Sequence, residues 1–134
     1  MPGLGDILSY KDYEFEDGSK QNKFFIVLSD SPCCLVLKTT SQTKRYQHIN
    51  DGCNQQKRVF SIPIEPKEFF DLPTFVQLPK LEEFTSKQLL QGSFHKQITI
   101  INLPLSSQCV QKLLKCLRHF RDDISLKHWK VLFS

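Results

Sequence analysis

Basic side chains gather in one polar segment of the chain, residues 38–58. The segment holds five lysine and arginine residues against one acidic residue. Tyr46, Gly52 and several amides lie among them, a composition typical of an exposed loop that could hold a polyanion such as RNA. The alternative interpretation is an ordinary solvated loop without a ligand.

His48 is the residue of this segment that is suited to proton transfer. An unperturbed imidazole titrates near pH 6.5, so it could act as a general acid or base at neutral pH. The other histidines, His95, His119 and His128, fall in or near the C-terminal part of the chain. We interpret those three as surface or packing residues.

The cysteine count is odd, and residues 1–6 do not resemble an export leader, so we expect reduced thiols and a cytoplasmic protein. The five cysteines are Cys33, Cys34, Cys53, Cys109 and Cys116. A metal site built from Cys33, Cys34, His48 and Cys53 is the alternative to buried structural thiols. Because no pair has the spacing of a structural zinc motif, we predict no metal and no cofactor.

The chemistry-bearing residues must be positioned by a hairpin that we predict over residues 23–42. Two apolar runs, 24–28 and 33–37, are rich in β-branched and aromatic residues and are too short for helices. The turn between them, 29–32, contains Pro32 and short polar side chains. The second strand ends in three consecutive hydroxyl residues, 39–41.

Further strands are predicted on both sides of this hairpin. The pattern favours an interrupted first strand within 7–15, joined to the hairpin by Asp17-Gly18, and later strands at 58–64 and 74–78. We expect Pro79 to stop the last of these. A short helix is predicted at 81–91, closed by Gly92, while 95–102 fits either a strand or a connector.

The C-terminal part is predicted to be helical. Ser106 or Ser107 can cap a helix whose apolar stripe includes Val110, Leu113 and Leu117. Asp122 and Asp123 are expected to break this helix, and a second short helix follows within 125–133.

Five or six short strands with one late helix favour a mainly β protein closed into a small barrel. We therefore predict a single domain, 1–134, with a barrel at about 5–102 and a helical part at about 104–134. No apolar run is long enough to span a bilayer.

Three short motifs resemble the MazF/PemK family of toxins from toxin-antitoxin systems. They are Gly5-Asp6-Ile7, the Gly18-Ser19-Lys20 sequence before the strand that ends in residues 26–29, and Thr39-Thr40-Ser41. A weaker likeness continues through residues 74–76 and the late helix. The resemblance implies an SH3-like barrel of the MazF/PemK/CcdB type with a C-terminal amphipathic helix, and a homodimer.

The resemblance also implies a metal-independent endoribonuclease that cuts single-stranded RNA and is inhibited by a cognate antitoxin protein. The RNA 2′-hydroxyl would attack the adjacent phosphate, which requires proton transfer and donors for the developing charge. The positions that match the family's catalytic arginine and its threonine or serine are Lys23, Thr39, Thr40 and Ser41. Lysine supplies a point charge in place of the planar fork of arginine. Arg45 and Arg58 are the candidates for supplying a guanidinium from elsewhere.

The predicted RNA-binding residues are Lys20, Lys38, Lys44, Arg45, His48, Lys57 and Arg58. The alternative function is a catalytically inactive barrel that binds or inhibits a protein partner, as related barrels that poison topoisomerase do. For Lys23 and the hydroxyl residues, the corresponding alternative is an ordinary lysine and ordinary hydroxyls at strand ends.

Overall fold

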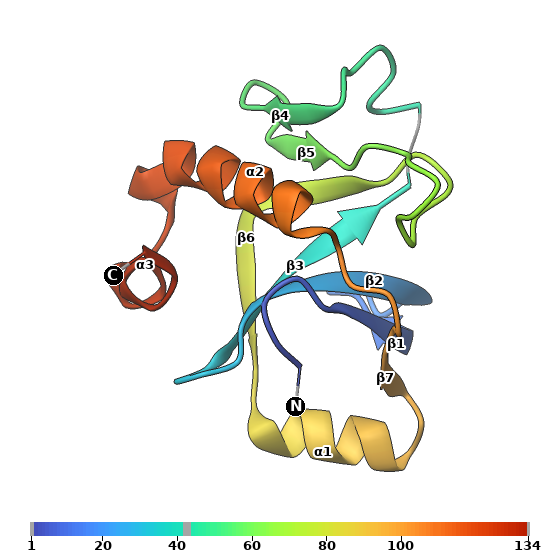
Figure 1. The fold of residues 1–134 in the computed structure, drawn as a ribbon. Helices are drawn as coiled ribbons and strands as arrows, with labels where there is room; N and C mark the ends of the chain where they lie inside the picture. The colour runs from blue at the N-terminus through green and yellow to red at the C-terminus, as the bar shows by residue number, and fades with distance from the viewer. Residues whose placement is uncertain (1, 42–43, 134) are drawn as a thin grey trace.

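An antiparallel sheet of seven strands forms the centre of the described part of the chain, in the order β4-β5-β6-β3-β2-β1-β7 (Figure 1). The computed structural model describes residues 2–41 and 44–133. The strands are β1 (Ile7–Glu14), β2 (Lys20–Ser29), β3 (Cys34–Thr40), β4 (Gly52–Asn54), β5 (Val59–Ser61), β6 (Phe75–Phe84) and β7 (Ile98–Ile100). The helices are α1 (Ser86–Phe94), α2 (Ser107–Leu117) and α3 (Leu126–Phe133), with a 3-10 segment, η1 (Arg118–Asp123), between α2 and α3.

The predicted central hairpin is confirmed as β2 and β3, which pair with Phe25 opposite Lys38 and Val27 opposite Val36. Its apolar runs are continuous because both faces of the sheet are covered. Ile26 and Leu37 belong to the hydrophobic cluster under α2, whereas alternate residues such as Phe25 and Val36 belong to a second cluster on the other face. Side chains alternate faces along a strand, so a strand buried on both sides must be apolar at every position.

Helices α1 and α2 lie on opposite sides of the sheet (Figure 1). Helix α2 begins as predicted: the Ser106 hydroxyl accepts a hydrogen bond from the backbone N–H of Cys109 at 3.2 Å. Its apolar stripe, including Leu113 and Leu117, is buried in the cluster on its side of the sheet. The helix ends before the predicted break, since residues 118–123 form the 3-10 segment, and α3 follows close to its predicted position.

The prediction that Pro79 stops the strand is wrong. Strand β6 continues through Pro79 to Phe84, because Pro79 lies at an irregularity where Leu37 pairs with Leu81 but Thr39 pairs with Val76. A proline there removes no donor from the regular ladder.

The predicted helix at 81–91 begins later, at Ser86, and its end was also predicted wrongly. Thr85 and Gln88 form a capping box that fixes the start. Gly92 does not close the helix but lies inside it, where an added Cβ would come within 2.5 Å of the Ile98 side chain. The ambiguous segment after the helix contains a strand, β7, which pairs with β1.

The fold is mainly β as predicted, but the sheet is not closed into a barrel. Among the described residues, the end strands β4 and β7 each pair with one neighbour and not with each other. Closure would require such a pairing. None of the described helices is long and apolar enough to cross a membrane.

Two of the five cysteines are not reduced thiols, which corrects the sequence prediction. Cys53 on β4 and Cys116 on α2 form a disulfide across 63 residues of sequence. Cys33, Cys34 and Cys109 are free, and burial raises the pKa of both Cys34 and Cys109 to about 11. Cys34 and Cys109 are buried, which agrees with the interpretation as structural thiols and not with the alternative of a metal site.

The disulfide should stabilise the attachment of the β4–β5 hairpin to α2. Replacing the exposed Cys53 by serine should lower the free energy of unfolding by about 2–4 kcal/mol, because the cross-link restricts the unfolded chain. Urea unfolding followed by circular dichroism measures the change. Cys33→Ser is the matched control and should change stability little. An unchanged urea midpoint for Cys53→Ser would contradict the stabilising role.

Candidate functional site

A pocket with a volume of about 470 Å³ lies where β2 begins and β3 ends, beside the connector between β5 and β6. Its lining includes all four residues predicted to be catalytic, namely Lys23, Thr39, Thr40 and Ser41. The other lining residues are Asn22, Phe24, Phe69, Phe70, Asp71, Leu72 and Thr74. The structure therefore brings the predicted residues together in one concave site.

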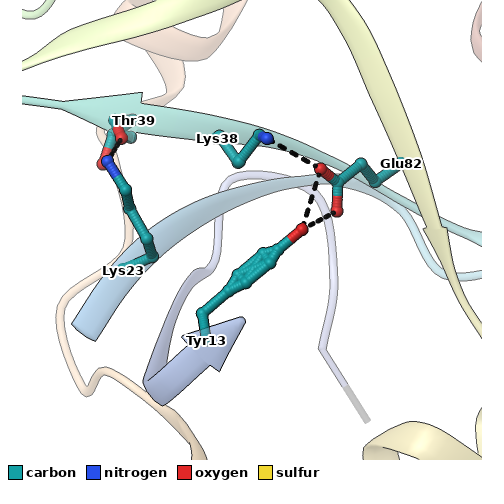
Figure 2. Close-up of polar contacts among 5 residues, drawn as sticks. All are labelled: Tyr13, Lys23, Lys38, Thr39 and Glu82. Carbon is teal, nitrogen blue, oxygen red and sulfur yellow. Dashed lines mark hydrogen bonds and ion pairs between the residues drawn. The ribbon is translucent and has the colours of Figure 1, made fainter. Parts of the chain in front are cut away.

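Antiparallel pairing explains why Lys23 and Thr39 meet. The beginning of β2 and the end of β3 fall at the same end of the hairpin. The Lys23 Nζ donates a hydrogen bond to the Thr39 backbone carbonyl at 3.2 Å (Figure 2). The Thr39 hydroxyl donates to the Phe24 carbonyl at 3.0 Å. Both side chains are thus held in fixed positions at the pocket.

The Lys23 ammonium lies in a partly desolvated position. Its Nζ is 5.4 Å from the centre of the Phe15 ring, a distance at which a cation is attracted to the aromatic face. Burial, and secondly the charge of Lys38, lower the pKa of Lys23 below its usual value of 10.5. A charge that has lost part of its water gains more from an anionic ligand than a fully hydrated charge does.

Lys38 belongs to a separate network beside this lysine (Figure 2). Its Nζ lies 3.2 Å from a carboxylate oxygen of Glu82, and the Tyr13 hydroxyl donates to the same carboxylate at 3.0 and 3.2 Å. Burial, and next the charge of Glu82, raise the pKa of Tyr13 to about 12. The network holds β1, β3 and β6 together, and the Lys38 charge is already balanced by Glu82.

One wall of the pocket is aromatic. Phe24, Phe69 and Phe70 contact one another edge to face, with ring centres 5.1–5.6 Å apart. Phe24 and Phe69 are half-buried and Phe70 is buried. Aromatic faces beside a cation and hydroxyl groups form a surface suited to a ligand with both a planar ring and a negative charge.

The predicted RNA-binding residues are not part of the pocket lining. Arg58 pairs with Asp123 at 3.3 Å and lies over the Phe120 ring, and Arg45 lies over Tyr46. Neither arginine therefore places its guanidinium in the pocket beside Lys23 in this conformation. Lys38 is paired with Glu82. The other four members of the set are exposed and lie outside the pocket lining: Lys20, Lys44, His48 and Lys57.

His48 is not brought to the pocket, so its predicted role in proton transfer gains no support from its position. The imagined metal site is also not assembled, because Cys53 is held in the disulfide. Within residues 2–41 and 44–133, no three potential metal-ligating side chains cluster together.

Several pocket residues were missed in the sequence. Asn22, Phe69, Phe70 and Asp71 line the site, yet no functional role is predicted for any of them from the sequence. Two adjacent phenylalanines followed by an aspartate in a predicted loop were the available signal, since apolar residues in a connector need a packing surface. The partnership of Tyr13 with Glu82, 69 residues apart, left no local signal.

Comparisons with known proteins leave the site to be interpreted from its own geometry. No family model, curated protein or solved structure matches the chain.

The shifted pKa of Tyr13 can be measured directly. Because the folded protein favours the protonated phenol, its contribution to stability is complete below pH 10 and is lost as the pH rises toward about 12. An ultraviolet titration of phenolate absorbance should show one late ionisation in the wild type. Tyr13→Phe should remove it, and Glu82→Gln should move it to lower pH. Persistence of the late step in Tyr13→Phe would assign it to another tyrosine.

Proposed function

We propose that the protein is an endoribonuclease that cleaves single-stranded RNA without a metal ion. The observation that supports this function is the pocket that gathers Lys23, Thr39, Thr40 and Ser41. A phosphodiester needs a positive charge and hydrogen-bond donors at its oxygens when its 2′-hydroxyl attacks. This set of side chains offers both.

The proposed reaction follows from this arrangement of groups. The RNA 2′-hydroxyl loses its proton to water and its oxygen forms a bond to phosphorus. The bond from phosphorus to the 5′-oxygen breaks and that oxygen takes a proton from water, leaving a 2′,3′-cyclic phosphate and a 5′-hydroxyl. Lys23 would stabilise the negative charge on the non-bridging oxygens, and the hydroxyls of Thr40 and Ser41 would donate hydrogen bonds to them. The Thr39 hydroxyl, which donates to the Phe24 carbonyl, would hold the strand ends in place. Lysine would do this as a point charge held by the Thr39 carbonyl, where the resembling family uses an arginine.

The wider context belongs to the same proposal. We infer a splayed variant of an SH3-like barrel, supported by register irregularities in β2–β3 and β3–β6, since such bulges bend and twist a sheet. A homodimer, a cognate antitoxin and a cytoplasmic location accompany the family resemblance. The exposed basic residues would extend RNA binding beyond the pocket through phosphate contacts.

A second candidate function is a protein-binding module without nuclease activity. An apolar groove of about 520 Å³ between α1 and β7 supports it, with Leu90 73% exposed and Ile100 48% exposed. No acidic residue occurs between Glu83 and Asp122, while Lys87 and Lys96 lie in this stretch. Charge complementarity therefore favours an acidic, apolar segment of a partner protein as the occupant.

Cleavage of a long single-stranded RNA in EDTA separates the two functions. Wild-type protein should cut the RNA, and a Lys23→Ala plus Thr40→Ala variant should be at least about 100-fold slower, since a preorganised donor alone contributes that order of rate. Lys112→Ala, an exposed lysine on α2, is the matched control and should cut normally. RNA left equally intact by wild type and variant would refute the nuclease and leave the binding module.

The lowered pKa of Lys23 predicts the alkaline limit of activity. As the pH rises through this pKa, which lies below 10.5, the ammonium loses its proton and cleavage should fall. Lys23→Arg should retain activity to higher pH, because a guanidinium stays charged throughout this range. Initial rates across the alkaline range, corrected for spontaneous hydrolysis, give the two profiles. Identical alkaline limbs would show that another group controls the decline.

A further inference from the structure

We propose that the same pocket contains a guanine-binding subsite, formed by the aromatic wall of Phe24, Phe69 and Phe70 and read by the Asp71 carboxylate. This inference rests on the proposed function, because it identifies which nucleotide of a single-stranded RNA the pocket accepts.

The charges of the pocket match the two ends of a nucleotide. Lys23 is the one cationic side chain and Asp71 the one carboxylate among the described residues that line it. A volume of about 470 Å³ lies within the roughly 300–1,000 Å³ typical of small-molecule sites. A phosphate beside Lys23 would leave the base to extend toward the other lining residues, away from the ammonium.

The aromatic wall suits a base. Single-stranded RNA is commonly recognised by stacking of unpaired bases on aromatic side chains. Phe24 and Phe69 are only half-buried, so parts of their rings remain accessible to a ligand. Their edge-to-face contacts with Phe70, which packs into the core under α2, hold this wall in place.

The carboxylate then discriminates among bases. An ionised carboxylate only accepts hydrogen bonds, and its two oxygens can take two parallel donors. On its Watson–Crick edge guanine presents two adjacent donors, N1–H and the N2 amino group. Adenine and cytosine each place one amino donor beside a ring-nitrogen acceptor, and uracil places its N3–H between two carbonyl acceptors. Each of those three would bring an acceptor lone pair against Asp71.

Asp71 is available for this role. Its side chain is exposed on the connector before β6 and forms no hydrogen bond or ion pair with the other described residues. Replacing it should therefore leave the fold intact. Asparagine is informative at this position, because it offers one donor and one acceptor and so matches the amino group and ring nitrogen of adenine or cytosine better than the two donors of guanine.

Binding of four short RNAs tests the subsite without requiring cleavage. Each is a fluorescent oligouridine with one central G, A, C or U, whose central sugar lacks the 2′-hydroxyl so that it cannot attack. Fluorescence anisotropy should show the G oligonucleotide binding about 10- to 100-fold more tightly than the others, the usual range for a good bidentate contact to a base. Asp71→Asn should lose this preference and shift it toward A and C.

Asp30→Asn is the matched control, because it removes the same charge from an exposed position in the β2–β3 turn, outside the pocket. It should retain the preference for G. Thermal unfolding should show that both variants are folded.

Each remaining outcome is decisive. Equal binding of the four RNAs by the wild type, or an unchanged preference in Asp71→Asn, would refute the guanine subsite even if RNA is cleaved. Preferential binding of G by a protein that leaves cleavable RNA intact would support the subsite and refute the nuclease. Binding of none of the four would refute both.

Discussion

The antiparallel pairing of β2 with β3 is the constraint on which the site depends. Residues 25–28 of β2 and most of β3 are buried, with alternate side chains in two clusters on opposite faces, so the register is fixed by both hydrophobic clusters at once. A slip of one residue would exchange the faces of every side chain. With the register fixed, Lys23 and Thr39 must lie at the same end of the hairpin, where the ammonium reaches the Thr39 carbonyl. The strand pairing that stabilises the sheet therefore also positions the candidate catalytic residues.

The two lysines at this end of the sheet have different roles. Lys38 is balanced by Glu82, which is also hydrogen-bonded to Tyr13. Within residues 2–41 and 44–133, Lys23 contacts a backbone carbonyl and an aromatic ring but forms no ion pair with a carboxylate, so its charge remains available to an anion in the pocket. Burial, and secondly the charge of Lys38, lower its pKa below the usual value of 10.5. This difference supports a role in ligand binding for Lys23 and a structural role for Lys38.

The hairpin could be predicted from sequence because its apolar runs and its turn are local signals, and α2 because Ser106 and the apolar stripe are local too. Pro79 misled the prediction, since its tolerance in β6 depends on a bulge against β3 that the local sequence does not reveal. The capping box of Thr85 and Gln88 was a readable signal for the start of α1. Pairing of Cys53 with Cys116, and the arrival of Asp71 at the pocket, depend on tertiary packing and could not be read from spacing.

The central claim is that the pocket beside Lys23 and Thr39 holds RNA. Nuclear magnetic resonance of isotopically labelled protein, titrated with a single-stranded RNA that cannot be cleaved, tests it without assuming catalysis. We predict that the backbone amides of residues 22–24, 39–41 and 69–71 shift most, while those of α1 and β7 stay unchanged. Shifts confined to α1 and β7, or no shifts at all, would contradict the account.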